Sequence, residues 1–130
     1  MREDSRELSV QTCLESLGIS LFSEWDVLAF LYHHKVSLTT TDQIARLIGY
    51  ESAAVSDALD RLERERLIER SRPLQGVRLY RMLTQTDARR QRCLRQLVSL
   101  SENRAGRLLL AKRLQPVRSE SGEEKNRLNL

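Results

Sequence analysis

The 130-residue sequence predicts a mainly α-helical domain with one small β-hairpin and with extra helices at both ends. Apolar residues recur at helical spacing over several segments, which is the period of an amphipathic helix. Two short β-compatible runs flank PLQG, where Pro73 and Gly76 favour a tight turn. The length and an apolar content of 40% suit a single domain, which we expect to cover residues 1–114.

A first helix is expected from about Ser5, within an N-terminal helical segment of residues 5–22. Leu8, Leu14 and Leu17 lie at roughly helical spacing. Gly18 directly follows them and is expected to stop the helix at Leu17.

A second helix is expected to begin at Ser23, because Ser23 and Asp26 have the spacing of a capping box. The helix should end near His34-Lys35, where cations suit the negative end of the helix dipole. The segment 36–38 is extended enough for a one-bridge strand. The apolar stripe of this helix consists of Trp25, Leu28, Ala29, Leu31 and Tyr32.

The segment DQIARLIGYESAAVSDALDRL, residues 42–62, has the pattern of two short helices joined by a turn at Gly49. Thr40 and Gln43 form a predicted capping box at its start. Such a pair of helices needs apolar locking positions, a small residue at the crossing and a turn residue that tolerates positive φ. The locking residues are Ile44, Ile48, Val55 and Ala58, and the crossing residue is Ala45. We therefore predict a helix-turn-helix over residues 41–65.

The hairpin is predicted over residues 67–83, and a C-terminal helix is predicted over residues 86–114. One apolar seam runs through this last segment, which favours a single continuous helix. Ser99 and Glu102 also fit a capping box, so two helices with a break near residue 100 are the alternative. Residues 115–130 are polar after Gln115-Pro116 and are expected to be a disordered tail.

Charge is distributed unevenly along the chain, although the net charge is only +4. Residues 1–60 hold 4 basic and 10 acidic side chains, whereas residues 61–95 hold 11 basic and 4 acidic ones. Of the 22 basic residues 19 are Arg, which suits bidentate contacts with phosphate or guanine. The middle of the chain therefore fits a polyanionic partner. Arg89, Arg90 and Arg92 are expected on an exposed helix face.

No enzyme activity, metal or cofactor is indicated. Cys13 and Cys93 are 80 residues apart without a CxxC motif, so we expect two reduced, structural cysteines. The pair His33-His34 has no companion zinc ligands. A Gly-rich phosphate loop and a recognisable nucleophile, base and acid are also missing. The longest apolar run, VLAFLY at 27–32, is too short to span a bilayer, so we expect a cytoplasmic protein without membrane contact.

This order of segments resembles the winged helix-turn-helix transcription regulators, most closely their MarR-like and ArsR-like branches. The resemblance covers roughly residues 24–98 and rests on TTTDQIARLIGYESAAVSDALDRLERERLIER, followed by a hairpin and LYRMLTQTDAR. It implies a recognition helix in the major groove, a hairpin or wing on the backbone or minor groove, and a dimer built by terminal helices. Where MarR-like proteins commonly have Gly before the first wing strand, Arg66 is present, so the recognition helix must end without that Gly or bear some strain.

The candidate DNA contacts lie on the recognition helix, at the start of the preceding helix and around the wing. Arg72 and Arg78 flank the projecting turn and are expected to contact phosphate. The amide-rich start of the recognition helix also suits phosphate. The full set is Thr41, Ser52, Ala53, Ser56, Asp57, Arg61, Arg70, Arg72 and Arg78, of which Ser52, Ala53, Ser56 and Asp57 are candidates for reading bases.

Asp57 and Asp60 are unexpected on a helix face that meets a polyanion. Asp57 precedes Arg61 by four residues and Asp60 precedes Arg64 by four, which is the favourable order for ion pairs along a helix. Paired acids can orient the arginines, and either Asp can accept a hydrogen bond from cytosine N4. The alternative is that both are ordinary solvated ion pairs.

A homodimer on a palindromic site is expected, because one winged helix makes few contacts and two-fold pairing doubles them. The same C-terminal seam can instead pack within the chain against the N-terminal helix, and both arrangements can hold. The candidate dimer interface consists of Leu8, Leu94, Leu97, Val98, Ser101, Ala105, Leu108 and Leu109.

The sequence thus favours a sequence-specific regulator that binds double-stranded DNA as a homodimer, and the resemblance suggests a small-molecule effector of unknown identity. One alternative is a winged helix used as a protein-interaction module, which the acidic first half and the acidic recognition helix motivate. Another is a redox-sensing regulator that uses Cys13, as do organic-peroxide-sensing relatives of MarR with a cysteine near the N-terminus.

Overall fold

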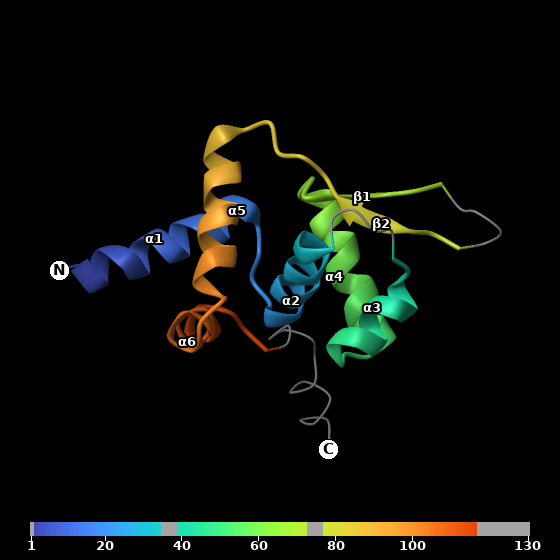
Figure 1. The fold of residues 1–130 in the computed structure, drawn as a ribbon, viewed down its shortest axis with the longest axis horizontal. Helices are drawn as coiled ribbons and strands as arrows, with labels where there is room; N and C mark the ends of the chain where they lie inside the picture. The colour runs from blue at the N-terminus through green and yellow to red at the C-terminus, as the bar shows by residue number, and fades with distance from the viewer. Residues whose placement is uncertain (1, 35–38, 73–76, 117–130) are drawn as a thin grey trace, which may run out of the picture.

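The computed structural model describes residues 2–34, 39–72 and 77–116, with side chains from residue 10 onward. In these ranges six helices and one antiparallel pair of strands follow in the predicted order, which confirms the predicted fold class (Figure 1). The elements are α1 (Arg2–Leu17), α2 (Phe22–His33), α3 (Thr41–Ile48), α4 (Ser52–Arg64), β1 (Ile68–Arg70), β2 (Tyr80–Met82), α5 (Ala88–Leu100) and α6 (Arg104–Arg113).

The helices form two groups that share one apolar core. Figure 1 shows α1, α5 and α6 at one end and α3, α4 and the hairpin at the other, with α2 between them. α1 packs against α5 and α6, whereas α4 packs against α2, α3 and β1. The core runs through both groups, and its fully buried side chains include Leu17, Leu28, Leu59 and Leu97. None of the helices in the described ranges is long and apolar enough to cross a bilayer.

α1 ends at Leu17, where Gly18 adopts a left-handed conformation with φ 74°. The predicted stop at Gly18 is therefore correct, but residues 18–21 are not helical, so the helical segment predicted for 5–22 is too long. Glycine has no Cβ and can turn the chain at this point at little cost.

α2 begins at Phe22, and its N-cap residue is Leu21, two residues before the cap that the Ser23 and Asp26 pattern predicts. The side chain of Glu24 is fully buried, and its Oε1 accepts hydrogen bonds from the backbone N–H groups of Ser20 at 2.9 Å and Leu21 at 3.1 Å. These bonds satisfy donors that the first turn of a helix leaves free. The predicted cap was wrong because the Glu24 side chain reaches back to Ser20 and Leu21, whereas Asp26 accepts a hydrogen bond from Tyr50 in the turn between α3 and α4.

The helix-turn-helix follows the local signals of the sequence. Thr40 Oγ1 accepts a hydrogen bond from the backbone N–H of Gln43 at 3.1 Å, and Gln43 Oε1 accepts one from the N–H of Thr40 at 2.9 Å. This is the predicted capping box. Gly49 ends α3 with φ 83°, as the turn requires. α4 then runs to Arg64 and buries the face formed by Val55, Ala58, Leu59 and Leu62.

α4 ends in a Schellman motif whose left-handed residue is Arg66, with φ 63°. The N–H of Arg66 donates to the carbonyl of Glu63 at 3.0 Å, and the N–H of Leu67 donates to that of Leu62 at 3.0 Å. Glycine normally occupies this position, because a Cβ raises the energy of the left-handed conformation by about 1–2 kcal/mol. The chain therefore bears strain at Arg66, which is one of the two alternatives that the sequence left open.

Replacing Arg66 with glycine is expected to stabilise the fold by about 0.5–1 kcal/mol, because the relief of strain exceeds the extra entropy of glycine in the unfolded chain. Urea unfolding measures this difference directly. Arg64→Gly, at the last helical residue of α4, is the matched control and should destabilise. A less stable R66G protein would contradict the assignment of strain.

The strands pair antiparallel, with Ile68 opposite Met82, Glu69 opposite Arg81 and Arg70 opposite Tyr80. Thr39 adds an isolated bridge to Tyr80, through N–H···O bonds of 2.9 and 3.3 Å. The one-bridge strand predicted at 36–38 and the predicted turn at Pro73 and Gly76 lie outside the described residues. Buried Ile68 and Tyr80 anchor the base of the wing on the helices.

The single helix predicted over residues 86–114 is interrupted, which corrects the favoured interpretation. α5 ends at Leu100, and α6 begins at Arg104 after Asn103, whose side-chain oxygen accepts a hydrogen bond from the N–H of Gly106 at 2.7 Å. The break lies close to the alternative position near residue 100, but its cap is Asn103 rather than Ser99.

The segment after α6 returns to the start of α2. Gln115 donates its N–H to the carbonyl of Ser20 at 3.0 Å, and its own carbonyl accepts from the N–H of Phe22 at 2.8 Å. Leu114 is buried beside it. The disordered tail predicted from residue 115 therefore begins too early, and residues 117–130 lie outside the described residues.

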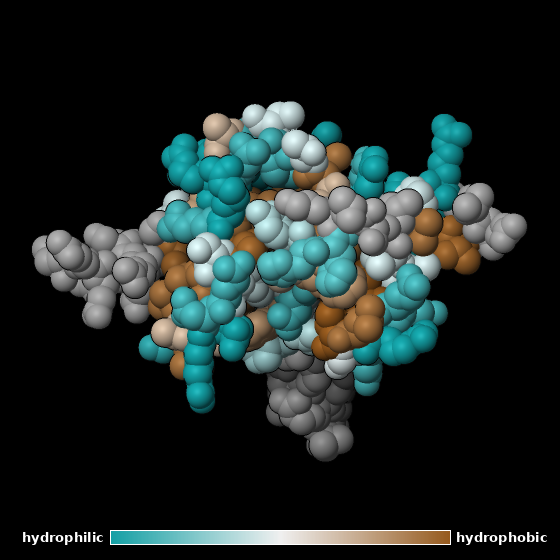
Figure 2. Space-filling model, viewed as in Figure 1, coloured by the Kyte–Doolittle hydropathy of each residue, from teal (hydrophilic) through white to brown (hydrophobic). Residues whose placement is uncertain are grey.

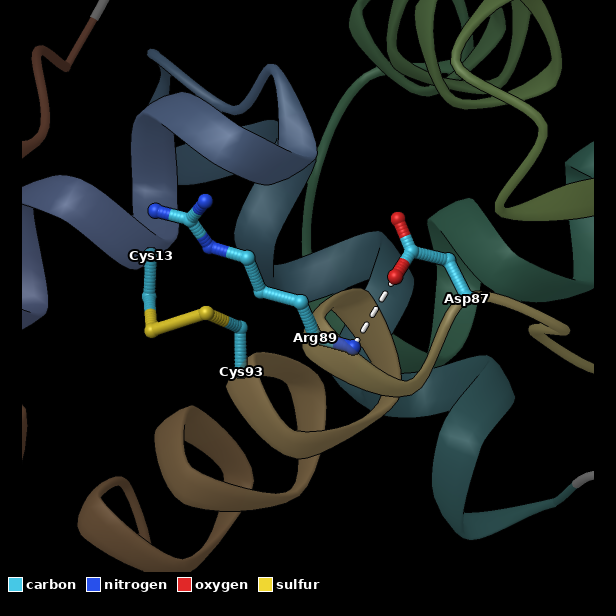
Figure 3. Close-up of a disulfide and its surroundings, with 4 residues drawn as sticks. All are labelled: Cys13, Asp87, Arg89 and Cys93. Atoms are coloured by element: carbon cyan, nitrogen blue, oxygen red, sulfur yellow. Dashed lines mark hydrogen bonds between the residues drawn. A yellow bond between two sulfur atoms is a disulfide. The ribbon is translucent and has the colours of Figure 1, made fainter.

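A disulfide joins Cys13 of α1 to Cys93 of α5, with their Cα atoms 5.1 Å apart (Figure 3). The expectation of two reduced cysteines is therefore wrong for this structure. Both cysteines lie on buried helix faces in contact, and the bond fixes α1 to α5. Figure 3 also shows Asp87, which caps the start of α5 by accepting a hydrogen bond from the N–H of Arg89 at 2.9 Å.

Candidate nucleic-acid interface

The start of α4 presents an exposed polar surface. Ser52, Ala53 and Ser56 are all exposed. Glu51 occupies the N-cap position but makes no side-chain hydrogen bond to the helix. The first backbone N–H groups of a helix have no partner within the helix and carry partial positive charge. This end of α4 can therefore donate hydrogen bonds to an anion.

Asp42 of α3 positions one of these residues. The Oγ of Ser52 donates a hydrogen bond to Oδ1 of Asp42 at 3.1 Å, across the turn between the two helices. Thr41, the first residue of α3, is half-buried beside it. The turn region thus brings three candidate residues close together: Thr41, Ser52 and Ala53. Asp42 belongs to the same site, although the sequence did not reveal it. No local pattern signals a contact between side chains ten residues apart.

The acids of α4 remain exposed, and the predicted ion pairs do not form. In the part of the chain that the structure describes, no ion pair links Asp57 to Arg61 or Asp60 to Arg64. Arg61 points instead to the segment between α1 and α2, where its Nε donates to the carbonyl of Gly18 at 3.1 Å. It also lies 3.9 Å from the carboxylate of Glu65.

The arginines of the wing fall into two classes. Arg70 at the end of β1 pairs with Glu63 of α4 at 3.3 Å, and Arg81 of β2 pairs with Glu69. Arg72 and Arg78, closer to the tip, are exposed, and within the described residues neither forms an ion pair. Figure 1 shows the hairpin projecting away from α1, on the side of α3 and α4. The base of the wing is therefore neutralised, whereas its outer part keeps free positive charge.

Arg72 and Arg78 are also held at corresponding positions on the two arms. Ser71 and Leu79 exchange hydrogen bonds, since the Ser71 N–H donates to the Leu79 carbonyl at 2.8 Å and the Leu79 N–H donates to Ser71 Oγ at 3.0 Å. Continuing this register places Arg72 opposite Arg78. Like charges directly opposite each other destabilise a hairpin. An anionic partner bound between Arg72 and Arg78 would neutralise this repulsion.

A half-buried contact connects the turn of the helix-turn-helix to α2. The hydroxyl of Tyr50 donates a hydrogen bond to Oδ2 of Asp26 at 2.7 Å. Burial raises the pKa of Asp26, and the hydrogen bond from Tyr50 lowers it by a smaller amount. The net direction is upward, so the folded protein binds the Asp26 proton more tightly than the unfolded chain does.

Asp26→Asn is therefore expected to change how stability depends on pH. A carboxyl group with a raised folded-state pKa contributes stability at acidic pH and loses it as pH rises above the ordinary value of about 4. The amide keeps an acceptor for Tyr50 but has no charge to bury. Urea unfolding at pH 4 and at pH 7 measures this dependence. The free energy of unfolding should fall less between pH 4 and pH 7 in the variant than in the wild type. Exposed Asp60→Asn is the control, and a pH-independent difference between wild type and D26N would contradict the assignment.

An open cleft of about 740 Å³ lies between the end of α2, the base of the wing and α5. Its polar lining was not apparent from the sequence, because the residues come from three separate segments. They include Tyr32, Glu69, Arg81, Gln85, Gln91 and Arg95.

The candidate dimer residues do not share one surface. Leu94, Leu97 and Val98 are buried, and their helix packs on α1 within the chain. Ser101 and Leu109 are half-buried, whereas Ala105 is exposed and Leu108 is 58% exposed. Leu8 lies outside the side chains that the structure describes. On the face in Figure 2 the surface is mostly hydrophilic, and apolar residues form separate patches.

Comparisons with known proteins agree with this architecture. Residues 18–76 match the model of the MarR family. The chain is similar to S. aureus MepR in complex with DNA, with a TM-score of 0.58, 19% identity, and coverage of 99% of this chain and 90% of that one. MepR described as a transcription regulator of the multidrug efflux pump MepA gives a TM-score of 0.55, 21% identity, and 99% and 89% coverage. Apo MarR from E. coli gives a TM-score of 0.54 and 20% identity, with coverage of 98% of this chain and 88% of that one. No curated protein matches the sequence. The fold is therefore a MarR-like winged helix-turn-helix.

Proposed function

We propose that this MarR-like chain is a transcription regulator that binds double-stranded DNA as a homodimer, with α4 in the major groove and the wing on the phosphate backbone. The match of residues 18–76 to the MarR family and the fold shared with DNA-bound MepR support it. The observation that carries the proposal is the pair of unneutralised arginines, Arg72 and Arg78, at the outer part of the wing. Phosphate contacts from such residues supply much of the affinity of a DNA-binding protein.

The other candidate residues take separate roles in this proposal. Ser52, Ala53, Ser56 and Asp57 are exposed on α4 and read bases, while the free N–H groups at its start and Thr41 contact phosphate. Arg61 and Arg70 support the surface through Gly18 and Glu63. The exposed part of α6, with Ala105 and Leu108, joins the N-terminal helix in the dimer interface. The proposal includes no catalytic step, and a regulator of transcription acts in the cytoplasm with the DNA.

Binding to mixed genomic DNA fragments at low salt tests this function. We expect affinity that falls steeply as salt rises, because counterions compete for each phosphate contact. Ser56→Ala and Asp57→Ala should change which fragments are selected, whereas Ser99→Ala on the exposed side of α5 should not. Undetectable binding at low salt would reject the proposal and leave the protein-interaction module as the function.

A second candidate function, regulation by oxidation, is favoured by the Cys13–Cys93 disulfide. Disulfides of cytoplasmic proteins are usually transient and redox-sensing or catalytic. An organic peroxide would oxidise the two thiols to this disulfide and be reduced to an alcohol and water. The test compares the DNA affinity of the disulfide form with that of the dithiothreitol-reduced form. Equal affinities, with both thiols titrated as free after reduction, would reject this second function.

We assign the cleft between α2, the wing and α5 to a small-molecule effector. Arg81 and Arg95 on its lining favour an anionic or strongly polar molecule. A ligand there contacts both β2 and α5, so its binding would affect the wing and the helix that packs on α1.

A further inference from the structure

We propose that Arg90 is a positioning residue that sets the orientation of α4 relative to the α1 and α5 pair, and thereby the separation of the two DNA half-sites that a dimer accepts. This inference rests on the proposed function. Arg90 was expected on an exposed helix face, but the structure shows it half-buried and turned toward the end of α4.

The bond that carries the inference joins two helices that otherwise belong to different groups. Nη2 of Arg90 donates a hydrogen bond to the carbonyl of Glu65 at 2.7 Å. The Schellman motif of α4 satisfies the carbonyls of Leu62 and Glu63, but it leaves the carbonyl of Glu65 free. A cationic donor at this place also meets the negative end of the helix dipole. The Nε of Arg90 is buried and has no hydrogen-bond partner in the described residues, so the contact depends on Nη2.

A second side chain, Gln85 just before α5, also bonds the end of α4, and we call the contacts of Arg90 and Gln85 with residues 65 and 66 the joint. Nε2 of Gln85 donates to the carbonyl of Arg66 at 3.0 Å and to that of Leu83 at 2.9 Å. The start of α5 is therefore fastened to the end of α4 at two successive carbonyls, those of residues 65 and 66. On the opposite side, the carboxylate of Glu65 lies against Gly18 in the linker that follows α1.

The joint is connected directly to the helix pair at the other end of the molecule. Arg90 precedes Cys93 by three residues on α5, and Cys93 is bonded to Cys13 of α1. α5 packs mainly on α1, whereas α4 packs on α2 and α3. The position of α4 relative to the α1 and α5 pair therefore depends on this joint together with the shared core.

The length of α4 makes small rotations at this joint matter for DNA binding. Thirteen residues span about 20 Å at 1.5 Å per residue. A tilt of about 10° around the C-terminal end therefore moves the start of α4 by about 3 Å. This displacement is close to the 3.4 Å rise of one base pair. A dimer with a loosened joint should accept half-sites at more than one separation.

Selection from a pool of double-stranded oligonucleotides with a random central region tests the inference. We expect the wild type to recover two half-sites at one strongly preferred separation. Arg90→Ala should recover the same half-site sequence over two or more neighbouring separations, and it should bind the wild-type spacing about three- to tenfold more weakly. Arg90→Lys should restore part of the preference, because an ammonium can also donate to a terminal carbonyl. Arg92→Ala, which removes the same charge from an exposed position of α5, should behave as wild type.

The outcomes separate this inference from the proposed function. A wild type that selects no paired half-sites defeats the proposed function. A wild type that selects them, with R90A keeping the same single separation, overturns the role of Arg90. If R90A does not fold, as judged by urea unfolding, Gln85→Ala carries the test, because it opens the same joint at Arg66. An unchanged separation in the folded Q85A protein would then overturn the inference.

Discussion

Replacing Arg72 and Arg78 together with alanine is expected to weaken DNA binding by about 100-fold at low salt, for all DNA sequences alike. Both side chains are exposed and free of ion pairs among the described residues, so their loss removes phosphate contacts and frees no buried partner. The dependence of affinity on salt should also become shallower, by about 0.9 in the log–log slope for each lost contact. The measurement is a titration of genomic fragments over a series of salt concentrations.

The matched control for the wing variant is Arg89→Ala with Arg92→Ala, which removes two exposed charges from α5. If net charge alone drives binding, both double variants weaken it equally. If the wing contacts DNA, only the wing variant changes the salt slope. A wing variant that loses binding to one sequence and keeps the others would contradict the assignment of phosphate contacts.

The features that could be predicted from the sequence have local causes. The capping box of Thr40 and Gln43, the left-handed turn at Gly49 and the stop at Gly18 each depend on a few consecutive residues. The buried faces of α3 and α4 follow from helical spacing alone. The sequence left two alternatives at Arg66, a helix end without a left-handed residue or a strained one, and the structure has the strained one with positive φ.

The break between α5 and α6 was not predictable from periodicity. The three residues from Ser101 to Asn103 amount to almost one helical turn, so the apolar seam continues across the break without a change of phase. The cap at Asn103 is local, but the close approach of Gly106 to α5 is a tertiary contact. Hydrophobic spacing therefore detects the two helices and misses the interruption.

The missed pairings share one reason, which is that each partner becomes close only in the folded chain. Cys13 and Cys93 each look like an apolar seam residue, and their bond depends on how α1 lies along α5. Within the described ranges, Arg61 forms no ion pair with Asp57, four residues before it, and its Nε instead donates to the carbonyl of Gly18, although it also lies 3.9 Å from Glu65 at the end of its own helix. Local spacing suggests partners along one helix, whereas the structure offers these side chains partners on other segments.

Replacing Gly106 with alanine is expected to destabilise the protein by about 2–4 kcal/mol, although helix propensity alone favours alanine by about 1 kcal/mol. A Cβ at this position would lie 1.8 Å from the carbonyl oxygen of Leu100 and 2.7 Å from its carbon. Both atoms belong to the backbone, so no side-chain rotation relieves the contact. The end of α5 and the start of α6 must separate, which disturbs buried Leu110 and Leu114.

Urea unfolding measures this loss, and Ala105→Ser, at the adjacent exposed position, is the control that should change stability by less than about 0.5 kcal/mol. Displacement of α6 also pulls on Gln115, which bonds the chain between Ser20 and Phe22 at the start of α2. We therefore expect G106A to dimerise more weakly as well, because α6 and the N-terminal helix form the proposed interface. A G106A protein as stable as the wild type would mean that the two helices meet with room for a methyl group, and the close approach assigned to Gly106 would be wrong.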